Sequence, residues 1–368
     1  MKTKSPKIAL VHDYLREYGG AERVLESLHA LFPDAPVYTA FVDERALGIH
    51  WSKFADWDIR TTWITKIPFY KQLHSPLRIF SPQYFSALDL SEYDIVISST
   101  NAYFSKAVSV PNGVQYCYCH TPARSLYGYE TMSDWKKNPI IRLAGTLINH
   151  YLRIVDFEVA QKVDYFIANS EETASRIKKF YRRDSVVINP PVRIPAKPPL
   201  SKVEKKYFLY VNRLAFSKHP DLAVEVCTKL DLPLKVVGEG KMLARLKDIA
   251  GPTIEFLGAV NDEKLSELYA GARALLYPVK NEDFGMVPIE AMGHGVPVIA
   301  HRSGGPCETI TDGVTGILFD DLSVEGLEKA LNIALKKKFD QNKIYDHSKK
   351  FSEAVFATKI KNLITAKQ

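Results

Sequence analysis

Short apolar runs alternate with amphipathic stretches along the first half of the chain. Four runs are rich in β-branched and aromatic residues and end in polar turns, which is typical of buried strands. They are residues 7–13, 93–99, 114–120 and 164–170. Residues 21–32 repeat apolar side chains at helical spacing, and residues 171–181 follow Ser170, a good N-terminal cap. The pattern therefore predicts strands that alternate with helices.

The same alternation restarts after a proline-rich stretch. Residues 188–206 carry five prolines and end in lysines, which favours a linker. Six further strands are expected at 207–213, 233–239, 253–258, 272–279, 297–300 and 315–319. Two runs of strand–helix alternation predict an α/β protein with two doubly wound, Rossmann-like parallel sheets. Ligands of such sheets bind at the carboxyl ends of the strands.

The length of 368 residues suits about two domains. We expect an N-terminal domain at 1–195 and a C-terminal domain at 196–345, divided within this linker. A final helical segment at 346–368 is expected to pack back on the N-terminal domain.

The stretch "NEDFGMVPIE" at 281–290 combines two acids with a glycine and a proline. Pro288 fits the first turn of a helix and not its interior, so a loop followed by a helix is expected. Glu282 then lies in the loop and Glu290 in the helix. Between them, the N–H groups of Gly285, Met286 and Val287 can face an anion, while carboxylates accept hydrogen bonds from vicinal hydroxyls. The alternative is a loop with two solvated acids.

Composition excludes several classes of protein. With 46% hydrophobic and 25% charged residues, the chain is an ordinary globular protein. No run approaches 18 uninterrupted apolar residues, and the N-terminus lacks a signal-peptide core, so we expect a cytoplasmic protein. The four cysteines lack zinc-type spacing and are expected to be reduced. Cys117 and Cys119 share one face of a strand, so we expect them in the core.

Charge is spread over both halves of the chain and gives a net +7, which is no nucleic-acid pattern. One window differs. Residues 60–83 hold four Lys/Arg side chains and His74, no acidic side chain, and several aromatic residues. Such a window can dock on an anionic membrane surface. Equally, its aromatic residues can pack inward, and the sequence leaves both interpretations open.

Further polar and glycine residues follow predicted strands. Gly19 and Gly20 precede the first helix, and His120 ends a strand of the first half. Arg213 and Lys218 follow the first strand of the second half, where two cations can neutralise a diphosphate. Alone, the two glycines are ordinary for a turn, and the two cations are ordinary surface charges. A dinucleotide site is not expected, because no G-x-G-x-x-G follows the first strand.

Taken together, these pieces resemble the retaining glycosyltransferases of family 4, the group 1 glycosyl transferases with the GT-B fold. The resemblance covers nearly the whole chain. Its most specific part is the pair of glutamates eight residues apart, followed by "GHGVPVIAHRSGGPCE". It implies two Rossmann-like domains facing across a cleft, with an acceptor-binding N-terminal domain and a nucleotide-sugar-binding C-terminal domain.

The resemblance also implies roles for individual residues. Glu282 and His120 are the catalytic residues at the transferred sugar. The donor-binding residues are Gly19, Gly20, Arg213, Lys218, Phe284, Gly285, Met286, Val287 and Glu290, with the two cations on the diphosphate and Glu290 on the ribose. Two departures stand out: Asn212 and His219 occupy positions where the family usually has glycine.

No metal cofactor is expected, because cations and N–H groups can meet the charge of the leaving diphosphate. The "DWD" at 56–58 lies away from the predicted ligand edge and is interpreted as solvated acids. The stretch "HTPARSLYGYE" resembles bacterial O-antigen and polysaccharide mannosyltransferases, which implies GDP-mannose as donor and a polyprenyl-linked glycan as acceptor at the inner membrane face. The alternatives are a UDP-sugar donor, a nucleotide-sugar epimerase of the same fold, and a non-catalytic glycan-binding protein.

Overall fold

The structure is a computed structural model that describes residues 6–129, 139–197 and 205–366. The chain forms two compact units, one of Met1–Pro191 with Ala357–Gln368 and the other of Val192–Phe356. The sequence pattern placed the corresponding boundaries at 195 and 345. Part of the proline-rich linker, 198–204, lies outside the described residues, as does Glu130 of the "HTPARSLYGYE" stretch.

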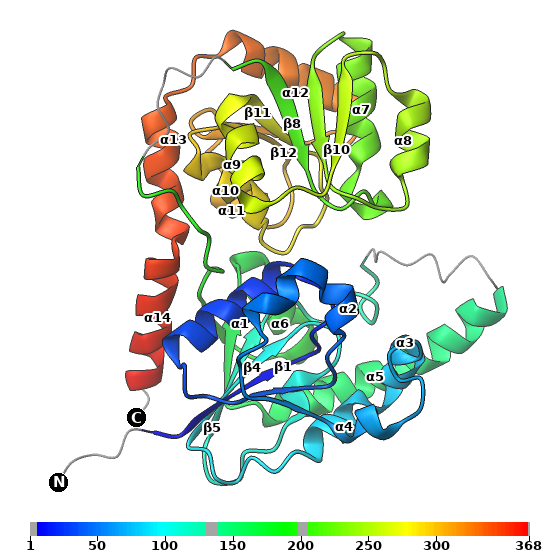
Figure 1. Cartoon of the computed structure of the whole chain (residues 1–368), viewed down its shortest axis with the longest axis vertical. Helices are drawn as coiled ribbons and strands as arrows, with labels where there is room; N and C mark the ends of the chain where they lie inside the picture. Colours follow the sequence, from blue (N-terminus) through cyan, green and yellow to red (C-terminus); the bar gives the residue numbers. More distant parts are fainter. Residues whose placement is uncertain (1–5, 130–138, 198–204, 367–368) are drawn as a thin grey trace. The chain divides into compact units, whose positions relative to one another are not determined.

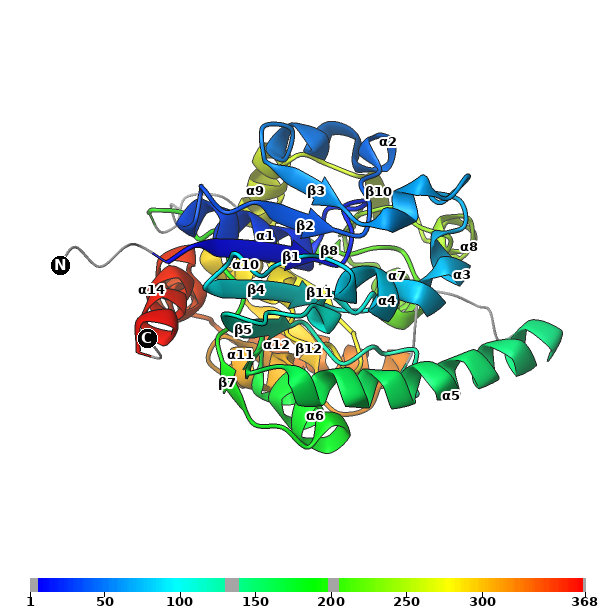
Figure 2. The same cartoon turned by 90° about the horizontal axis from the view of Figure 1, so that it is seen from below.

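The first unit is built on a seven-stranded parallel sheet with the order β3-β2-β1-β4-β5-β6-β7. Its strands are β1 (Ile8–His12), β2 (Val37–Thr39), β3 (Ile59–Thr61), β4 (Ile95–Thr100), β5 (Val114–Cys119), β6 (Tyr165–Ala168) and β7 (Ser185–Val187). Figure 2 shows β3, β2, β1, β4 and β5 side by side in this order. The register pairs His12 of β1 with Ser99 of β4, and Ser99 with Tyr118 of β5.

Helices and single turns connect these strands (Figure 1). They are α1 (Gly20–Leu31), α2 (Glu44–Leu47), η1 (Gly48–Lys53), η2 (Trp63–Lys66), α3 (His74–Leu77), η3 (Arg78–Phe80), α4 (Ser81–Ser86), η4 (Ser105–Ala107), α5 (Pro139–Lys162) and α6 (Glu171–Tyr181). The predicted cap at Ser170 is confirmed, because its side chain accepts a hydrogen bond from the Thr173 N–H. Cys117 and Cys119 lie fully buried in one core cluster, as expected for alternate positions of a strand.

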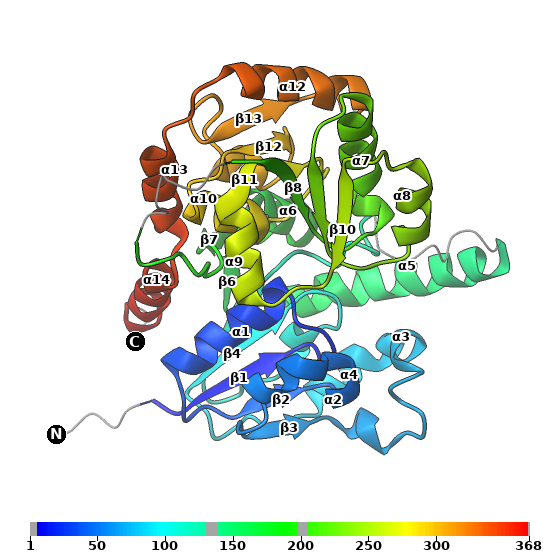
Figure 3. The ribbon, with the colours of Figure 1, turned by 45° about the horizontal axis from the view of Figure 1, so that its top comes forward.

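The second unit contains a six-stranded parallel sheet with the order β10-β9-β8-β11-β12-β13. The strands are β8 (Tyr207–Val211), β9 (Leu234–Val237), β10 (Ile254–Gly258), β11 (Ala272–Tyr277), β12 (Val298–His301) and β13 (Gly316–Phe319). Numbered from β8, this is the order 3-2-1-4-5-6 of dinucleotide-binding folds (Figure 3). Leu209 and Leu275 pack on one face of the sheet, whereas their neighbours Phe208 and Leu276 pack on the other. The continuous apolar runs are therefore explained by burial on both faces.

The helices of the second unit are η6 (Phe216–Lys218), α7 (Pro220–Lys229), α8 (Leu243–Ile249), α9 (Asp262–Gly271), α10 (Met286–Gly293), α11 (Pro306–Thr309), α12 (Val324–Lys336), α13 (Gln341–Ser348) and η7 (Lys349–Phe351). The last helix, α14 (Glu353–Thr365), begins in this unit and continues into the first. The prediction of two Rossmann-like parallel sheets is confirmed. In the described part of the chain, no helix combines the length and apolarity that a membrane span requires.

Candidate functional site

The two glutamates lie in the loop after β11 and in the helix α10 that follows it, as the sequence predicted. Glu282 lies in the loop, and Glu290 lies in the helix and is 8% exposed. Gly285 precedes the helix at φ 87° and ψ 73°, a left-handed conformation that favours glycine. Because Gly285 turns the chain into the helix, the N–H groups of Met286 and Val287 fall in the first turn, where they lack partners within the helix.

A second glycine turn, at Gly304 and Gly305, packs against this loop. The Gly305 N–H donates to the Glu282 carbonyl across 2.9 Å, and Gly304 forms an isolated parallel bridge with Glu282. A Cβ atom at Gly304 would lie 2.2 Å from the Glu282 carbonyl oxygen, and one at Gly305 would lie 2.1 Å from that of Phe284. These glycines therefore serve close packing between two chain segments, which holds Glu282 in place.

Lys218 and Glu282 form an ion pair, although the sequence analysis gave them separate roles. The Lys218 Nζ donates a hydrogen bond to the Glu282 carboxylate, and the two side chains are only 13% and 14% exposed. Burial first, and then the charge of Glu282, raises the pKa of Tyr277, the last residue of β11, well above its usual range. The phenol therefore remains a donor. Tyr277 carries no signal of its own in the sequence, because it is one of several tyrosines in apolar strands.

Arg213 is exposed in the loop that follows β8. Asn212, which stands where the family has glycine, accepts a hydrogen bond from the Arg213 N–H across 2.9 Å. Two glycines of the β9–α8 turn fit tightly against this loop. A Cβ atom would lie 1.9 Å from the Asn212 carbonyl oxygen at Gly238, and 2.3 Å from that of Leu214 at Gly240. The sequence shows this turn only as "GEG" at 238–240, and glycines at that spacing do not by themselves identify the loop that they approach.

His219, the second departure from the family pattern, lies in the left-handed backbone region that favours glycine. It lies at φ 47° and ψ 47° as the residue before α7. Its buried Nε2 has no hydrogen-bond partner among the residues that the structure describes. A residue with a Cβ pays a free-energy cost in this left-handed conformation.

Glu290 faces α9 from the middle of α10. The Tyr269 hydroxyl donates to its carboxylate across 3.2 Å. The Tyr269 ring stacks on His294, with centroids 5.1 Å apart, and His294 Nδ1 lies 2.8 Å from the Glu290 carbonyl oxygen. A buried carboxylate that keeps a polar neighbour is suited to accept hydrogen bonds from a diol.

The remaining predicted residues belong to the first unit. Gly19 precedes α1, Gly20 begins it, and the Gly19 N–H donates to the Glu22 carboxylate across 2.8 Å. His120 follows β5 directly, and its Nε2 lies 2.8 Å from Ser99 Oγ. Burial first, and then the nearby His12, lowers the pKa of His120 to about 4. This imidazole is therefore neutral near pH 7.

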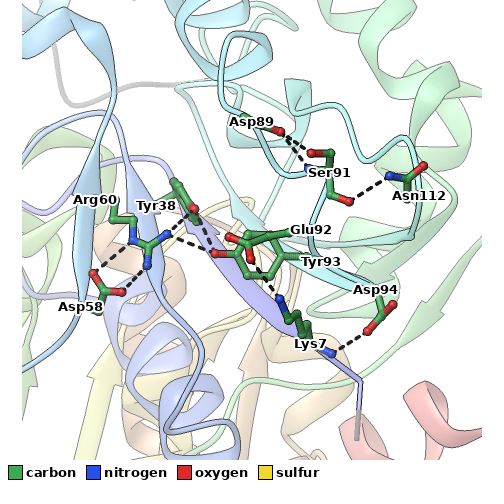
Figure 4. A network of polar contacts seen from close by, with 10 residues as sticks. All are labelled: Lys7, Tyr38, Asp58, Arg60, Asp89, Ser91, Glu92, Tyr93, Asp94 and Asn112. Atoms are coloured by element: carbon green, nitrogen blue, oxygen red, sulfur yellow. Dashed lines mark hydrogen bonds and ion pairs between the residues drawn. The ribbon is translucent and has the colours of Figure 1, made fainter. Parts of the chain in front are cut away.

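The "DWD" acids lie at the amino end of β3, opposite the carboxyl-end edge. Asp56 and Asp58 are exposed, but Asp58 is not merely solvated, because it pairs with Arg60 across 2.7 Å. Figure 4 shows Arg60 also reaching the hydroxyls of Tyr38 and Tyr93. Within the described ranges, no three His, Cys, Asp or Glu side chains are arranged to hold a metal ion.

Comparison with known sequences identifies the second unit. The sequence model of the family "Glycosyl transferases group 1" matches residues 194–354. A GDP-mannose-dependent alpha-mannosyltransferase of Mycolicibacterium smegmatis is 36% identical over 126 residues, which are 34% of this chain and 32% of that protein. Alpha-1,3/1,6-mannosyltransferase alg2 of Schizosaccharomyces pombe is 27% identical over 379 residues, 86% of this chain and 71% of that protein. The chain thus spans about a third of the length of the first relative.

Solved structures extend the likeness to the fold of the whole chain. The lipopolysaccharide outer core galactosyltransferase WaaB matches with a TM-score of 0.69 at 18% identity, covering 98% of this chain and 99% of that one. Anabaena Alr3699/HepE, solved with UDP-glucose, also gives a TM-score of 0.69, at 16% identity and with the same coverage of both chains. The chain has the GT-B fold, and its residues 194–354 match the group 1 glycosyl transferases.

Proposed function

We propose that this protein is a retaining glycosyltransferase that moves a sugar from a nucleoside diphosphate to a glycan acceptor. One observation carries the proposal: Lys218, Glu282 and the start of α10 converge on one loop of the second unit. A cation, a carboxylate and unpaired backbone N–H groups are the partners that a sugar–diphosphate needs. The match to the group 1 family over 194–354 supports it.

The chemistry follows from where charge develops in the reaction. Cleavage of the bond between the sugar and the diphosphate leaves an oxocarbenium-like sugar and an anionic leaving group. Lys218, Arg213 and the N–H groups of Met286 and Val287 stabilise the diphosphate, which is a preorganised electrostatic contribution. Because these groups supply the positive charge, we propose that transfer needs no divalent metal.

The two glutamates act on different parts of the donor. Glu290 accepts hydrogen bonds from the ribose hydroxyls, which do not react. Glu282 stands beside the transferred sugar and stabilises its developing positive charge. The Lys218 ammonium has three N–H donors. When the donor substrate binds, some of them bond to the phosphate in place of Glu282. The ion pair therefore links diphosphate binding to the position of the carboxylate.

The donor proposed here is GDP-mannose. Two kinds of support converge: the "HTPARSLYGYE" stretch in this sequence, and relatives named as GDP-mannose-dependent mannosyltransferases. UDP-sugars are the main alternative, since the similarly folded HepE was solved with UDP-glucose. The acceptor proposed is a glycan carried on a polyprenyl lipid at the cytoplasmic face of the membrane.

An enzyme with a membrane-bound acceptor needs a surface that can bind the lipid bilayer. In the 60–83 window, Tyr70 packs on the core, whereas Phe69 is 73% exposed and would be available to lipid. Arg78 of the window reaches Asn149 of α5 across 3.5 Å. Exposed apolar side chains follow one stripe of α5: Leu143, Leu147, Tyr151 and Ile154. No acid lies between Arg142 and Val155, so this surface suits an anionic lipid headgroup layer.

The proposal is tested by thermal unfolding with a panel of nucleotide sugars. A ligand that binds only the folded protein raises the melting temperature by mass action. We expect GDP-mannose to give the largest saturable shift, with GDP next. A larger shift with a UDP-sugar would reassign the donor, and no shift with any nucleotide sugar would contradict the proposed function. The Lys218→Met variant is the matched control, because it should lose most of the shift.

A further inference from the structure

A small basic cavity lies at the amino-end edge of the sheet in the second unit. It has a volume of about 220 Å³ and lies near the starts of β8, β11 and β12, beside the connection from α12 to α13. Its polar lining residues are Lys205, Arg273, Lys337, Lys338 and Gln341, and its other lining residues are apolar. All of them belong to the second unit, so the cavity is formed within one compact part of the chain.

The cavity is separate from the proposed donor site. Arg213 follows the carboxyl end of β8 and Glu282 follows that of β11, whereas the cavity lies near the amino ends of the same two strands. Figure 3 shows these strands in the sheet of the second unit. A six-residue strand such as β11 is about 20 Å long. The two places therefore lie on opposite edges of one parallel sheet, and the proposed transfer uses none of the polar residues of the cavity.

The lining of the cavity carries four cations and no carboxylate. Among the described residues, none of these four side chains forms an ion pair with an acid. Asp340 is the acid that lies closest in sequence to Lys338, but it does not line the cavity. Its carboxylate accepts hydrogen bonds from the N–H groups of Asn342 and Lys343, across 3.0 and 3.2 Å, and so caps α13. The described residues therefore leave the positive charge of the cavity without a counter-charge.

Aromatic rings and a carbonyl group, rather than acids, hold three of the cations. Arg273 Cζ lies 5.8 Å from the ring centroid of Phe208, and Lys337 Nζ lies 5.9 Å from that of Phe339. Lys205 Nζ donates one hydrogen bond to the Ala270 carbonyl oxygen across 2.6 Å. Burial lowers the pKa of Lys205, because no nearby acid offsets the loss of water around the ammonium group. A bound anion would supply that missing charge.

We propose that this cavity binds a soluble phosphate monoester, whose phosphate group is held by the four cations and whose hydroxyl group donates a hydrogen bond to Gln341 Oε1. A phosphate monoester carries close to two negative charges above pH 7 and three acceptor oxygens, which suits several convergent cations. The buried Gln341 Oε1 has no hydrogen-bond partner among the described residues, and an unpaired buried acceptor costs free energy. This site does not rest on the proposed function.

The size of the cavity limits the rest of the ester. A water molecule takes up about 30 Å³ of the liquid, so the cavity volume of 220 Å³ corresponds to roughly seven waters. This space suits a phosphate group with a short polyol such as glycerol. It is smaller than the pockets of about 300–1,000 Å³ that enclose drug-sized ligands. A nucleotide sugar is therefore too large for the cavity.

Calorimetric titration of the full-length protein near pH 8, without nucleotide sugar, tests the charge requirement. Methyl phosphate and methyl sulfate have nearly the same shape, but at this pH the phosphate is a dianion and the sulfate a monoanion. We expect methyl phosphate to bind at least about tenfold more tightly, because its second charge is met by the convergent cations. Equal affinities for the two esters would overturn the assignment to phosphate.

Two matched double variants locate the site. Lys337→Gln with Lys338→Gln removes two cations of the cavity and should weaken methyl phosphate binding at least about tenfold. Lys329→Gln with Lys336→Gln removes two exposed lysines of α12 that do not line the cavity, and it should change the affinity less than about twofold. Equal losses in the two double variants would mean that the ester binds to general surface charge, which would overturn the site.

Glycerol 3-phosphate tests the hydroxyl contact, because it adds two hydroxyl groups to the phosphate ester. The wild type should bind it roughly three- to tenfold more tightly than methyl phosphate, which is the effect of one hydrogen bond to a buried acceptor. Gln341→Met keeps the length of the side chain and removes the oxygen, so this variant should bind the two esters equally. A preference for glycerol 3-phosphate that survives in Gln341→Met would overturn this contact.

The donor site is the first alternative place for the ester. Lys218→Met changes the proposed donor site and should leave methyl phosphate binding unchanged. If Lys218→Met loses this binding and the Lys337→Gln, Lys338→Gln variant keeps it, the ester binds at the donor site and the cavity is overturned. A wild type that binds the ester and transfers no sugar would contradict the proposed function alone.

A lipid headgroup is the second alternative, because glycerol 3-phosphate is also the headgroup of phosphatidic acid. Co-sedimentation with vesicles that contain phosphatidic acid separates the two sources. We expect Lys337→Gln with Lys338→Gln to leave vesicle binding unchanged, since the cavity takes a soluble ester. Weaker vesicle binding in this variant, with no binding of free glycerol 3-phosphate to the wild type, would overturn the soluble source and assign the phosphate to lipid.

Discussion

Lys218 and Glu282 are 64 residues apart in the sequence, and the ammonium group of one donates a hydrogen bond to the carboxylate of the other. Both are largely shielded from water, so neither charge is screened as it would be at the surface. The pair therefore holds Glu282, which we propose acts on the sugar, next to Lys218, which we propose binds the phosphate, before the donor binds. Replacing either residue is expected to change the position and charge interactions of the other.

Buried His120 makes the stability of the first unit depend on pH. Its pKa lies at about 4 in the folded protein, below the ordinary histidine value of 6.5, so the neutral form is favoured by folding. This contribution is fully present above pH 6.5 and is lost as the pH falls through 4, by about 3 kcal/mol. Comparison of the wild type with His120→Asn, by urea unfolding from pH 7 to 4, should show the difference. A difference that stays constant with pH would contradict the burial of His120.

His219 is a site where a single substitution should stabilise the protein. Its left-handed backbone costs a residue with a Cβ about 1 kcal/mol, so His219→Gly should raise the free energy of unfolding by up to that amount. His219→Ala removes the ring but keeps the strain, and it is the matched control. Thermal and urea unfolding measure both variants. Equal stabilisation by both would instead trace the cost to the unpaired ring nitrogen.

Metal independence is tested by chelation. Because Arg213, Lys218 and the N–H groups at the start of α10 supply positive charge, transfer should continue at an unchanged rate in excess EDTA. The assay follows sugar transfer before and after dialysis against the chelator. Loss of turnover that magnesium or manganese restores would show that a metal ion takes part.

The proposed lipid surface is tested with vesicles that contain anionic phospholipid. Replacing Leu143 and Leu147 of α5 with glutamine removes two exposed apolar side chains and should weaken binding at least tenfold. Ile333→Gln, which changes an exposed isoleucine on α12, is the control and should have no effect. Co-sedimentation measures the partition. Binding that is unchanged in the α5 variant would exclude this helix as the docking surface.

The sequence predicted the sheets because their strands are buried on both faces and read as continuous apolar runs. It also placed Glu282 in a loop and Glu290 in a helix, from Pro288 and the glycines alone. It could not predict that Lys218 pairs with Glu282, since nothing local to either residue encodes a contact across 64 positions. The 3-residue strands β2, β3 and β7 are too short for a periodic signal. The roles of Gly238 and Gly304 became clear only from the backbone oxygens that they approach.

The two glutamates are the centre of the account, and their roles are separable by kinetics. Glu290 binds a part of the donor that does not react, so Glu290→Gln should mainly raise donor KM, by roughly 10- to 100-fold for a hydrogen bond to a charged group. Glu282 acts where charge develops, so Glu282→Gln should lower kcat on the order of 100-fold. Donor KM should not rise in Glu282→Gln, because Lys218 is released to the diphosphate.

Steady-state kinetics of these two variants, with circular dichroism to confirm folding, therefore tests the account most directly. It predicts a loss of kcat in Glu282→Gln and a rise of donor KM in Glu290→Gln. A loss of kcat in Glu290→Gln together with a change of KM alone in Glu282→Gln would contradict it.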